Sequence, residues 1–149
     1  MEEWTIIMYE YTRIVHYYET DKMGVVHHSN YIRWLEEART LYFNDANLAY
    51  FETEGYGIMS PVTDVSLKFK HFIKYGDSFT VRLEMIKYTG VRFRIAYTVV
   101  NQDGEVLLEA ESGHAFVGSD LKPVSLARAI PHRHELMNDL LTPTKETML

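Results

Sequence analysis

The second half of the chain is organised by an alternation of apolar and polar residues. After Gly57, apolar side chains fall at every second position in three separate runs, and a fourth long run follows them. A period of two is typical of β-strands that bury one face and leave the other more polar. Asp103-Gly104 and Thr89-Gly90 have the composition of hairpin turns between the last three runs. We therefore predict four antiparallel strands joined as a meander. The runs cover residues 65–69, 79–85, 91–99 and 106–117.

The first half of the chain contains one strongly amphipathic segment, from Asn30 to Ala46. Its apolar residues recur at spacings of three and four, which is the period of a helix with one buried face. Ser29 or Asn30 can cap the first turn through a side-chain oxygen. A weaker alternation over residues 8–17 predicts a strand before this helix. The apolar helix positions are Tyr31, Trp34, Leu35, Ala38, Leu41 and Tyr42.

The order of these elements predicts a single α+β domain over residues 1–149, with one helix wrapped by an antiparallel sheet. The core covers about residues 8–122, and residues 123–149 form a C-terminal tail. In the tail we expect short helices over 126–130 and 134–141, interrupted at Pro131, and an irregular end. One long helix leaves much of the sheet surface uncovered, so self-association is an economical way to cover it and to protect edge strands.

Composition narrows the class of protein. The chain of 149 residues is 46% hydrophobic, which is typical of a soluble globular domain. Its net charge of -6 argues against general nucleic-acid binding, although a local basic patch could still hold an anionic ligand. The absence of cysteine excludes disulfides and thiol catalysis. The acidic N-terminus has no signal-peptide pattern and no segment is long enough to span a membrane, so we expect a cytoplasmic protein.

Candidate chemistry gathers in residues 16–39, where the first strand ends in an acidic turn and the long helix begins at once. The turn carries Asp21, Gly24 and the pair His27-His28. A carboxylate, imidazoles and the N–H groups of a helix N-terminus therefore lie within a few residues. This combination suits a hydrolytic site, which needs a base or nucleophile beside an oxyanion binder.

A family resemblance is carried by the ordered set Tyr18-Glu19-Thr20-Asp21-x-x-Gly24-Val25-Val26-His27-His28-x-x-Tyr31. It resembles the signature of hotdog-fold acyl-CoA thioesterases of the 4-hydroxybenzoyl-CoA thioesterase type, most closely the bacterial branch associated with the Tol-Pal cluster. Two further segments match the family over a similarity that spans about residues 9–122. They are Glu36-x-x-Arg39 and Phe69-Lys70-His71-Phe72-x-x-Tyr75-Gly76-Asp77.

The resemblance implies a hotdog fold, in which a curved antiparallel sheet wraps a long central helix. It implies dimers with one continuous sheet, which often pair into homotetramers. It also implies hydrolysis of acyl-CoA to the free acid and CoA, with no metal or organic cofactor. An acyl carrier protein substrate is harder to exclude, because the turn before the fourth strand carries only Lys87 and Arg92 where aromatic-CoA relatives cluster basic residues. Lys70 or Arg94 could then contribute to nucleotide binding.

Residue roles follow from the same resemblance. Asp21 matches the catalytic aspartate, either as nucleophile on the thioester carbonyl or as general base for water. His28 matches a histidine near the thioester, chiefly through its backbone N–H as an oxyanion donor. Its ring could also orient water or protonate the thiolate, a weaker role because CoA thiolate leaves readily. Glu19 is a mild departure from an aspartate. The remaining expected substrate contacts are Gly24, Val26, Tyr31, Ser60, Lys87 and Arg92, with Ser60 acting across the dimer.

Simpler interpretations stand beside these roles. Asp21 alone could be a turn residue. Metal binding by His27-His28 is disfavoured, since neighbours on an extended chain point in opposite directions. Trp34, Tyr42 and Phe43 are expected in the core rather than in an acyl pocket. Two other functions compete with hydrolysis: an acyl-thioester dehydratase or hydratase on the same fold, and a non-catalytic binder of acyl-CoA or acyl carrier protein.

Overall fold

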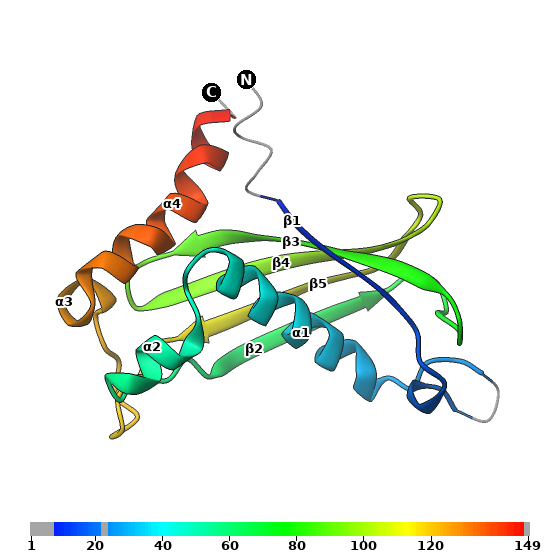
Figure 1. Cartoon of the computed structure of the whole chain (residues 1–149), viewed down its shortest axis with the longest axis horizontal. Helices are drawn as coiled ribbons and strands as arrows, with labels where there is room; N and C mark the ends of the chain where they lie inside the picture. The colour runs from blue at the N-terminus through cyan, green and yellow to red at the C-terminus, as the bar shows by residue number, and fades with distance from the viewer. Residues whose placement is uncertain (1–7, 22–23, 148–149) are drawn as a thin grey trace.

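The computed structural model describes residues 8–21 and 24–147 and forms one antiparallel five-stranded sheet (Figure 1). The strand order is β1-β3-β4-β5-β2. The predicted meander is therefore correct for β3 to β5 and wrong for β2, which pairs with β5 at the far edge. The other edge of β3 is already occupied by β1, so β2 cannot lie beside β3. The strands are β1 (Tyr9–Ile14), β2 (Val62–Phe69), β3 (Ser78–Tyr88), β4 (Arg92–Asn101) and β5 (Val106–Ala115).

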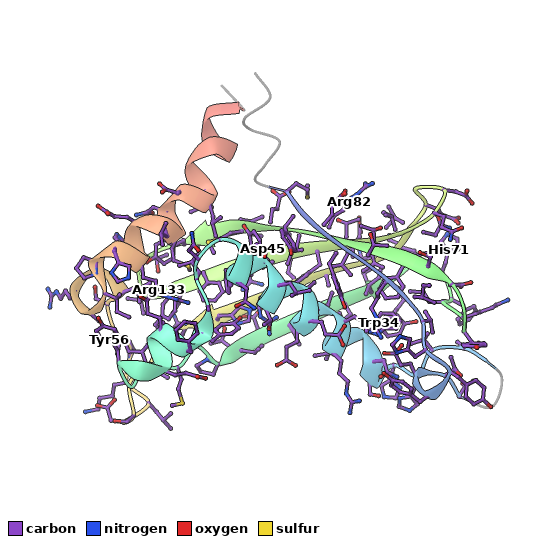
Figure 2. All side chains as sticks on the ribbon, viewed as in Figure 1. Trp34, Asp45, Tyr56, His71, Arg82 and Arg133 are labelled. Carbon is purple, nitrogen blue, oxygen red and sulfur yellow. The ribbon has the colours of Figure 1, made fainter. Side chains whose placement is uncertain are left out.

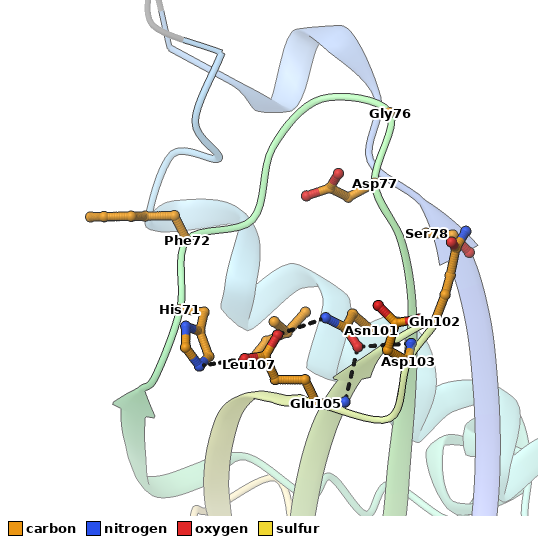
Figure 3. A pocket seen from close by; sticks show the side chains of 10 residues that line it. All are labelled: His71, Phe72, Gly76, Asp77, Ser78, Asn101, Gln102, Asp103, Glu105 and Leu107. Atoms are coloured by element: carbon orange, nitrogen blue, oxygen red, sulfur yellow. Dashed lines mark hydrogen bonds and ion pairs between the residues drawn. The ribbon is translucent and has the colours of Figure 1, made fainter.

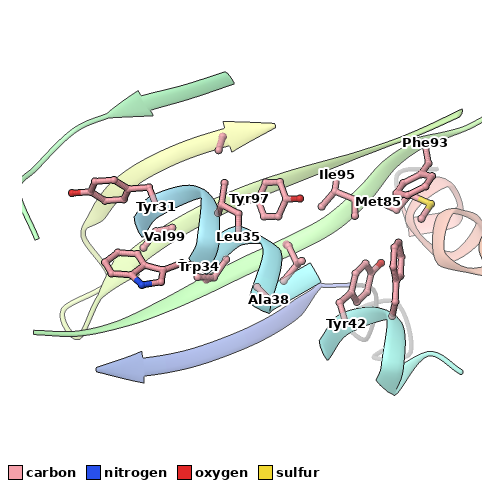
Figure 4. Packing of buried hydrophobic residues seen from close by; sticks show 14 of the residues in the cluster. Tyr31, Trp34, Leu35, Ala38, Tyr42, Met85, Phe93, Ile95, Tyr97 and Val99 are labelled. Carbon is pink, nitrogen blue, oxygen red and sulfur yellow. The ribbon is translucent and has the colours of Figure 1, made fainter. Parts of the chain in front are cut away.

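Helix α1 (Ser29–Asp45) lies across one face of this sheet, as the hydrophobic pattern predicts (Figure 1). Trp34 and Ala38 are fully buried and face the inward residues of β4 (Figure 4). Two positions differ from the prediction. Leu41 is 37% exposed, whereas Arg39 is only 9% exposed and donates a hydrogen bond to Tyr97. A charged residue on the buried side of a helix is hidden from a pattern based on hydrophobicity alone.

The turns at Thr89-Gly90 and Asp103-Gly104 are confirmed, with positive φ angles of 94° at Gly90 and 82° at Gly104. The first strand is shorter than predicted, because the chain turns into the 3₁₀ helix η2 (Tyr17–Glu19). The short helix α2 (Tyr50–Gly55) is not apparent from the sequence pattern.

The tail forms α3 (Leu126–Ala129) and α4 (Pro131–Thr147). Helix α4 is longer than the expected 134–141 because Pro131 occupies its first position, where a missing N–H costs no hydrogen bond. Arg133 is buried and donates to the carbonyls of Leu48 and Ala49. These hydrogen bonds tie α4 to the segment between α1 and α2. Within the described ranges, no helix combines the length and apolarity needed to cross a membrane.

Candidate active site

The acidic turn is held by its own backbone and by the loop before β3. The N–H of Asp21 donates to the carbonyl of Val25 at 2.8 Å, and the N–H of Gly24 donates back to the carbonyl of Asp21 at 3.0 Å. The Val25 N–H lies 3.3 Å from Oδ1 of Asp21. Gly24 has a φ of +78°, the left-handed conformation expected for a glycine at this position. Val25 also bridges to Lys74, so the turn is tied to the rest of the sheet.

The two histidines do not point in opposite directions, so that part of the sequence prediction is wrong. His28 already has helical backbone angles, and its ring stacks on His27 with centroids 4.3 Å apart. The helix start also differs from the expected cap. The ring Nδ1 of His27 accepts the N–H of Ser29 at 3.2 Å, and Asn30 donates its side-chain amide to the Glu19 carbonyl. In the described part of the chain, no group of three His, Asp or Glu side chains could hold a metal ion.

A cleft of about 490 Å³ opens beside the start of α1. Val26, His28 and Tyr31, three predicted site residues, line it together with Val25 from the turn that holds Asp21. The opposite wall comes from the end of β2 and the segment after it, and Phe69 contacts Tyr31 edge to face at 5.0 Å. The wall residues are Phe69, Lys70, His71 and Phe72.

These wall residues belong to a motif that the sequence shows, in which we assigned a possible site role to Lys70 alone. In the neighbouring polar pocket, Nε2 of His71 lies 3.0 Å from Oε2 of Glu105. Phe72 also lines that pocket, but its side chain is directed away from the other labelled residues (Figure 3). Phe72 is 78% exposed. The clustering of Phe69 and Phe72 around a basic and a polar residue is the signal that could have identified this wall, since exposed aromatic residues are characteristic of binding surfaces.

Glu19 holds the turn against α1 and β1. Its Oε2 accepts the indole N–H of Trp34 at 2.9 Å and lies 3.0 Å from the guanidinium of Arg13, while Oε1 accepts the His16 N–H at 2.8 Å. Burial raises the pKa of this carboxyl, but the hydrogen bonds from Trp34 and His16 and the charge of Arg13 outweigh it, so the pKa of Glu19 is lowered. Figure 2 shows Trp34 at the N-terminal half of α1, the half that lies nearer to the turn. Glu19 therefore serves to position the turn.

Trp34, Tyr42 and Phe43 lie in the hydrophobic core, as expected, with exposed fractions of 0%, 3% and 2%. Trp34 packs on Phe79, and Phe43 packs on Phe93. None of the three lines the cleft at the start of α1.

Ser60, Lys87 and Arg92 lie at the other end of the sheet. Lys87 and Arg92 line a cavity of about 170 Å³ with Thr63 and Asp64, just after Ser60. Strand β3 starts next to the loop that contacts the acidic turn and ends at Lys87 and Tyr88, and its 11 residues span about 35 Å. One protomer therefore does not bring these three residues to Asp21.

The positive charge at the Lys87 end of the sheet is partly neutralised by carboxylates. Arg94 forms a two-pronged pair with Asp64, at 3.1 and 2.9 Å, and a further contact with Glu111. These carboxylates raise the pKa of Arg94 through hydrogen bonds that outweigh its desolvation. Lys87 and Arg92 are therefore better placed than Arg94 to meet an anionic ligand at this end. Lys70, the other basic candidate, lies instead on the wall of the cleft beside α1.

Known proteins are similar to this chain in both sequence and fold. The model of the thioesterase-like superfamily matches residues 15–139. A Bacillus subtilis protein named "Putative acyl-CoA thioesterase YneP" is 35% identical over 80% of this chain and 88% of its own length. A 1,4-dihydroxy-2-naphthoyl-CoA hydrolase of Thermosynechococcus vestitus is 29% identical over 70% of this chain and 73% of its own.

Among solved structures, the DHNA-CoA thioesterase of Staphylococcus aureus superimposes with a TM-score of 0.88 at 32% identity, over 94% of this chain and 95% of that one. The hotdog architecture implied by the sequence motif is thus confirmed. The chain belongs to the thioesterase-like superfamily.

Proposed function

We propose that this protein hydrolyses an acyl-CoA thioester to the free acid and CoA. The enzyme class, thioester hydrolase, is that of its named relatives. The observation that carries the proposal is the position of Asp21, in a tied turn that includes Val25 and leads into Val26, both of which line an apolar cleft at the N-terminus of α1. A carboxylate here can attack a thioester carbonyl in the cleft or activate water beside it.

The hydrogen bonds of the helix start reduce the number of candidate oxyanion donors. The N–H groups of Asn30 and Tyr31 donate to the carbonyls of His27 and His28, and the Ser29 N–H donates to the His27 ring. The backbone N–H of His28 is therefore our candidate for the developing oxyanion, where the positive end of a 17-residue helix adds to the stabilisation. The His28 ring is left to orient water or substrate, because a thiolate leaves without a proton.

Strand β2 supplies the argument for a dimer. It is an edge strand whose side chains are almost all exposed, including Val62, Val65 and Phe69 at 51%, 41% and 52%. An exposed edge with apolar residues is a ready template for pairing. Antiparallel pairing of two β2 strands about a two-fold axis would extend the sheet and set the Val62 end of one subunit beside the Phe69 end of its partner.

That pairing would complete the site. The cleft lined by His28 and Phe69, beside the turn that holds Asp21, would receive Ser60 from the partner subunit. The partner's Lys87 and Arg92 would lie close enough for the phosphates of CoA. The split seen in one protomer is then the expected geometry of a shared site. A homotetramer built from two such dimers, and a cytoplasmic location, stay predictions from the sequence.

The cleft also favours a class of acyl group. Tyr31, Phe69 and Phe72 give it aromatic walls, and flat rings pack well edge to face or offset on such walls. Two relatives are named for the 1,4-dihydroxy-2-naphthoyl group. We therefore propose an aromatic acyl-CoA as the preferred substrate, with acyl carrier protein as the alternative carrier. The motif similarity to the Tol-Pal-associated branch stays a prediction from the sequence, and substrate kinetics decide between aliphatic and aromatic acyl groups.

The test is release of free thiol from a panel of short, medium, long and aromatic acyl-CoA thioesters. We expect Asp21→Asn to lower kcat at least about a hundredfold, because it removes the nucleophile or base while keeping the size of the side chain. Asp103→Asn, a turn carboxylate at the β4–β5 hairpin, is the matched control and should leave kcat unchanged. A folded Asp21→Asn protein with wild-type kcat would falsify the assignment. Binding without thiol release, or hydration of crotonyl-CoA, would instead favour a binder or a hydratase.

A further inference from the structure

A polar pocket of about 460 Å³ adjoins the apolar cleft beside α1 (Figure 3). His71 and Phe72 line both spaces, so the polar pocket begins where the aromatic wall of the cleft ends. Most of its other lining residues come from the start of β3 and from the hairpin between β4 and β5. A substrate group that extends past the aromatic wall therefore enters this pocket.

One side chain at the boundary is held by a series of hydrogen bonds from the β4–β5 hairpin. The side-chain oxygen of Asn101 accepts the N–H groups of Asp103 and Glu105, both at 2.9 Å, and its amide donates to Oε1 of Glu105 at 3.0 Å. Oε2 of Glu105 lies 3.0 Å from Nε2 of His71. The backbone N–H of His71 donates to the Leu107 carbonyl at 3.2 Å. The imidazole is thus fixed, through its ring and its backbone, between the cleft and the polar pocket.

The contact with Glu105 leaves Nδ1 as the ring nitrogen of His71 that can bind a ligand. An ionised carboxylate only accepts hydrogen bonds, so Nε2 carries a proton and donates to Glu105. Nδ1 accepts a hydrogen bond when the ring is neutral and donates one when the ring is protonated. A hydroxyl can do either, so it matches this nitrogen in both states.

The charge of the polar pocket limits which groups can enter it. Its lining carries three carboxylates, on Asp77, Asp103 and Glu105, whereas His71 supplies at most one positive charge. A second anion would meet repulsion at short range. The phosphates of CoA are disfavoured here for the same reason, which leaves the pocket to the acyl group.

The strand order gives the acyl group its direction. The polar pocket lies at the end of β3, β4 and β5, on one side of the cleft. In a dimer paired through β2, the partner subunit and its basic residues continue the sheet on the other side of the cleft. A substrate with its thioester at the start of α1 and its phosphates toward the partner therefore extends the far end of its acyl group toward His71.

We infer that His71, held by Glu105, selects the acyl group by the chemistry of the end remote from the thioester. It favours an uncharged hydrogen-bonding group, such as a hydroxyl, and the carboxylates around it reject an anionic end. This inference rests on the proposed function, because the selection acts on a thioester bound in the cleft. His71 meets the substrate far from the reacting atoms, so it determines specificity. Glu105 and Asn101 are positioning residues that act through it.

The experiment uses three benzoyl-CoA thioesters that carry a hydroxyl, a methyl or a carboxylate group at the para position. In the wild-type protein we expect kcat/KM to be about tenfold higher for the 4-hydroxy than for the 4-methyl thioester, as for one hydrogen bond to a positioned partner. We expect the 4-carboxy thioester to be about tenfold poorer than the 4-methyl thioester. Differences in intrinsic reactivity and in active fraction cancel when these ratios are compared between variants.

Two variants separate the two parts of the inference. His71→Phe keeps a ring and removes Nδ1, so the hydroxyl preference should fall to within about twofold of parity. Glu105→Gln removes one charge and leaves the imidazole in place, so the hydroxyl preference should persist while the discrimination against the carboxylate weakens about fivefold. Glu10→Gln is the matched control and should keep both wild-type ratios. Its carboxylate pairs with Arg82 at 2.9 Å, and its side chain is 55% exposed against 53% for Glu105.

Binding gives a readout that does not depend on hydrolysis. S-(4-hydroxyphenacyl)-CoA and S-(4-methylphenacyl)-CoA are thioethers that the enzyme cannot hydrolyse, and calorimetry measures their Kd. We expect the hydroxyl to lower Kd about fivefold in the wild-type protein and less than about twofold in His71→Phe. Wild-type ratios in His71→Phe, or a wild-type preference for the 4-carboxy thioester, would overturn the inference. If the wild-type protein releases no thiol from any thioester, the proposed function fails, while the ratio of Kd values still decides the role of His71.

Discussion

The two ends of the sheet differ in how their functional residues come together. At the Asp21 end, one short stretch of sequence supplies the turn, both histidines and the helix start, and local hydrogen bonds hold them. At the Lys87 end, residues from three separate segments meet around a small cavity. The first end is therefore preorganised within one subunit, whereas under the proposed function the second end acts in catalysis only through a neighbour. The proposal thus separates chemistry from ligand binding by the length of β3.

The largest expected effect comes from preventing the two ends from meeting. Val65→Lys would place charges from both subunits near the two-fold axis of a β2 pair, where like charges repel. We expect the mass measured by light scattering to fall to that of the monomer and kcat/KM to fall more than about a hundredfold. Ile86→Lys on β3, at 42% exposure against 41% for Val65, is the matched control. A dimeric, active Val65→Lys protein would contradict pairing through β2.

Mixed dimers sharpen the comparison. At substrate concentrations well below KM, a subunit with Asp21→Asn and a subunit with Lys87→Ala and Arg92→Ala are each expected to be weakly active alone. In a mixed dimer, one site combines the intact Asp21 of one chain with the intact basic residues of the other. Random mixing should restore about a quarter of wild-type activity, since about half of the dimers are mixed and each has one intact site. No recovery after subunit exchange would place both ends of the site within one chain.

Removing the basic residues at the Lys87 end is expected to affect substrate binding more than the chemical step. Lys87→Ala with Arg92→Ala should raise KM for acyl-CoA about tenfold and leave kcat within about twofold, because phosphate contacts are equally strong in ground and transition states. The wild-type KM should rise with ionic strength, and that dependence should weaken in the variant. Lys122→Ala with Arg128→Ala removes two basic residues outside this cavity as a control. An equal rise of KM in both pairs would contradict a specific role.

The smallest expected effect concerns the anchor of the Asp21 end. The pKa of Glu19 is lowered in the folded protein, so its contribution to stability is present above the unfolded pKa of about 4.3 and is lost as pH falls through the lower, folded value. Glu19→Gln should lower the free energy of unfolding at pH 7 by about 1–3 kcal/mol, as for loss of charged hydrogen bonds. It should also flatten the acid limb of stability against pH. Denaturant unfolding at a series of pH values measures both, and an unchanged acid limb would contradict this role.

The sequence predicts most of what is local. The period of two predicted β3 and β4, and the period of 3.6 predicted α1, because each depends only on neighbours along the chain. The acidic turn could be identified because Asp21 and His28 are seven residues apart. The place of β2 could not, since it depends on which sheet edges stay free after β1 has paired. The burial of Arg39 and of His114, which are 9% and 2% exposed, was not predicted. Charged and polar residues are assigned to the surface until their buried partners are known.

The exposed edge of β2 has a consequence for how this protein would work at low abundance. If each site is assembled from two chains, specific activity is set by the dissociation constant of the dimer as well as by kcat. Dilution would then switch the enzyme off without altering a single active-site atom. Activity per mole would rise with protein concentration and level off once the edges are paired, so the strand that closes the sheet would also act as a sensor of how much enzyme is present.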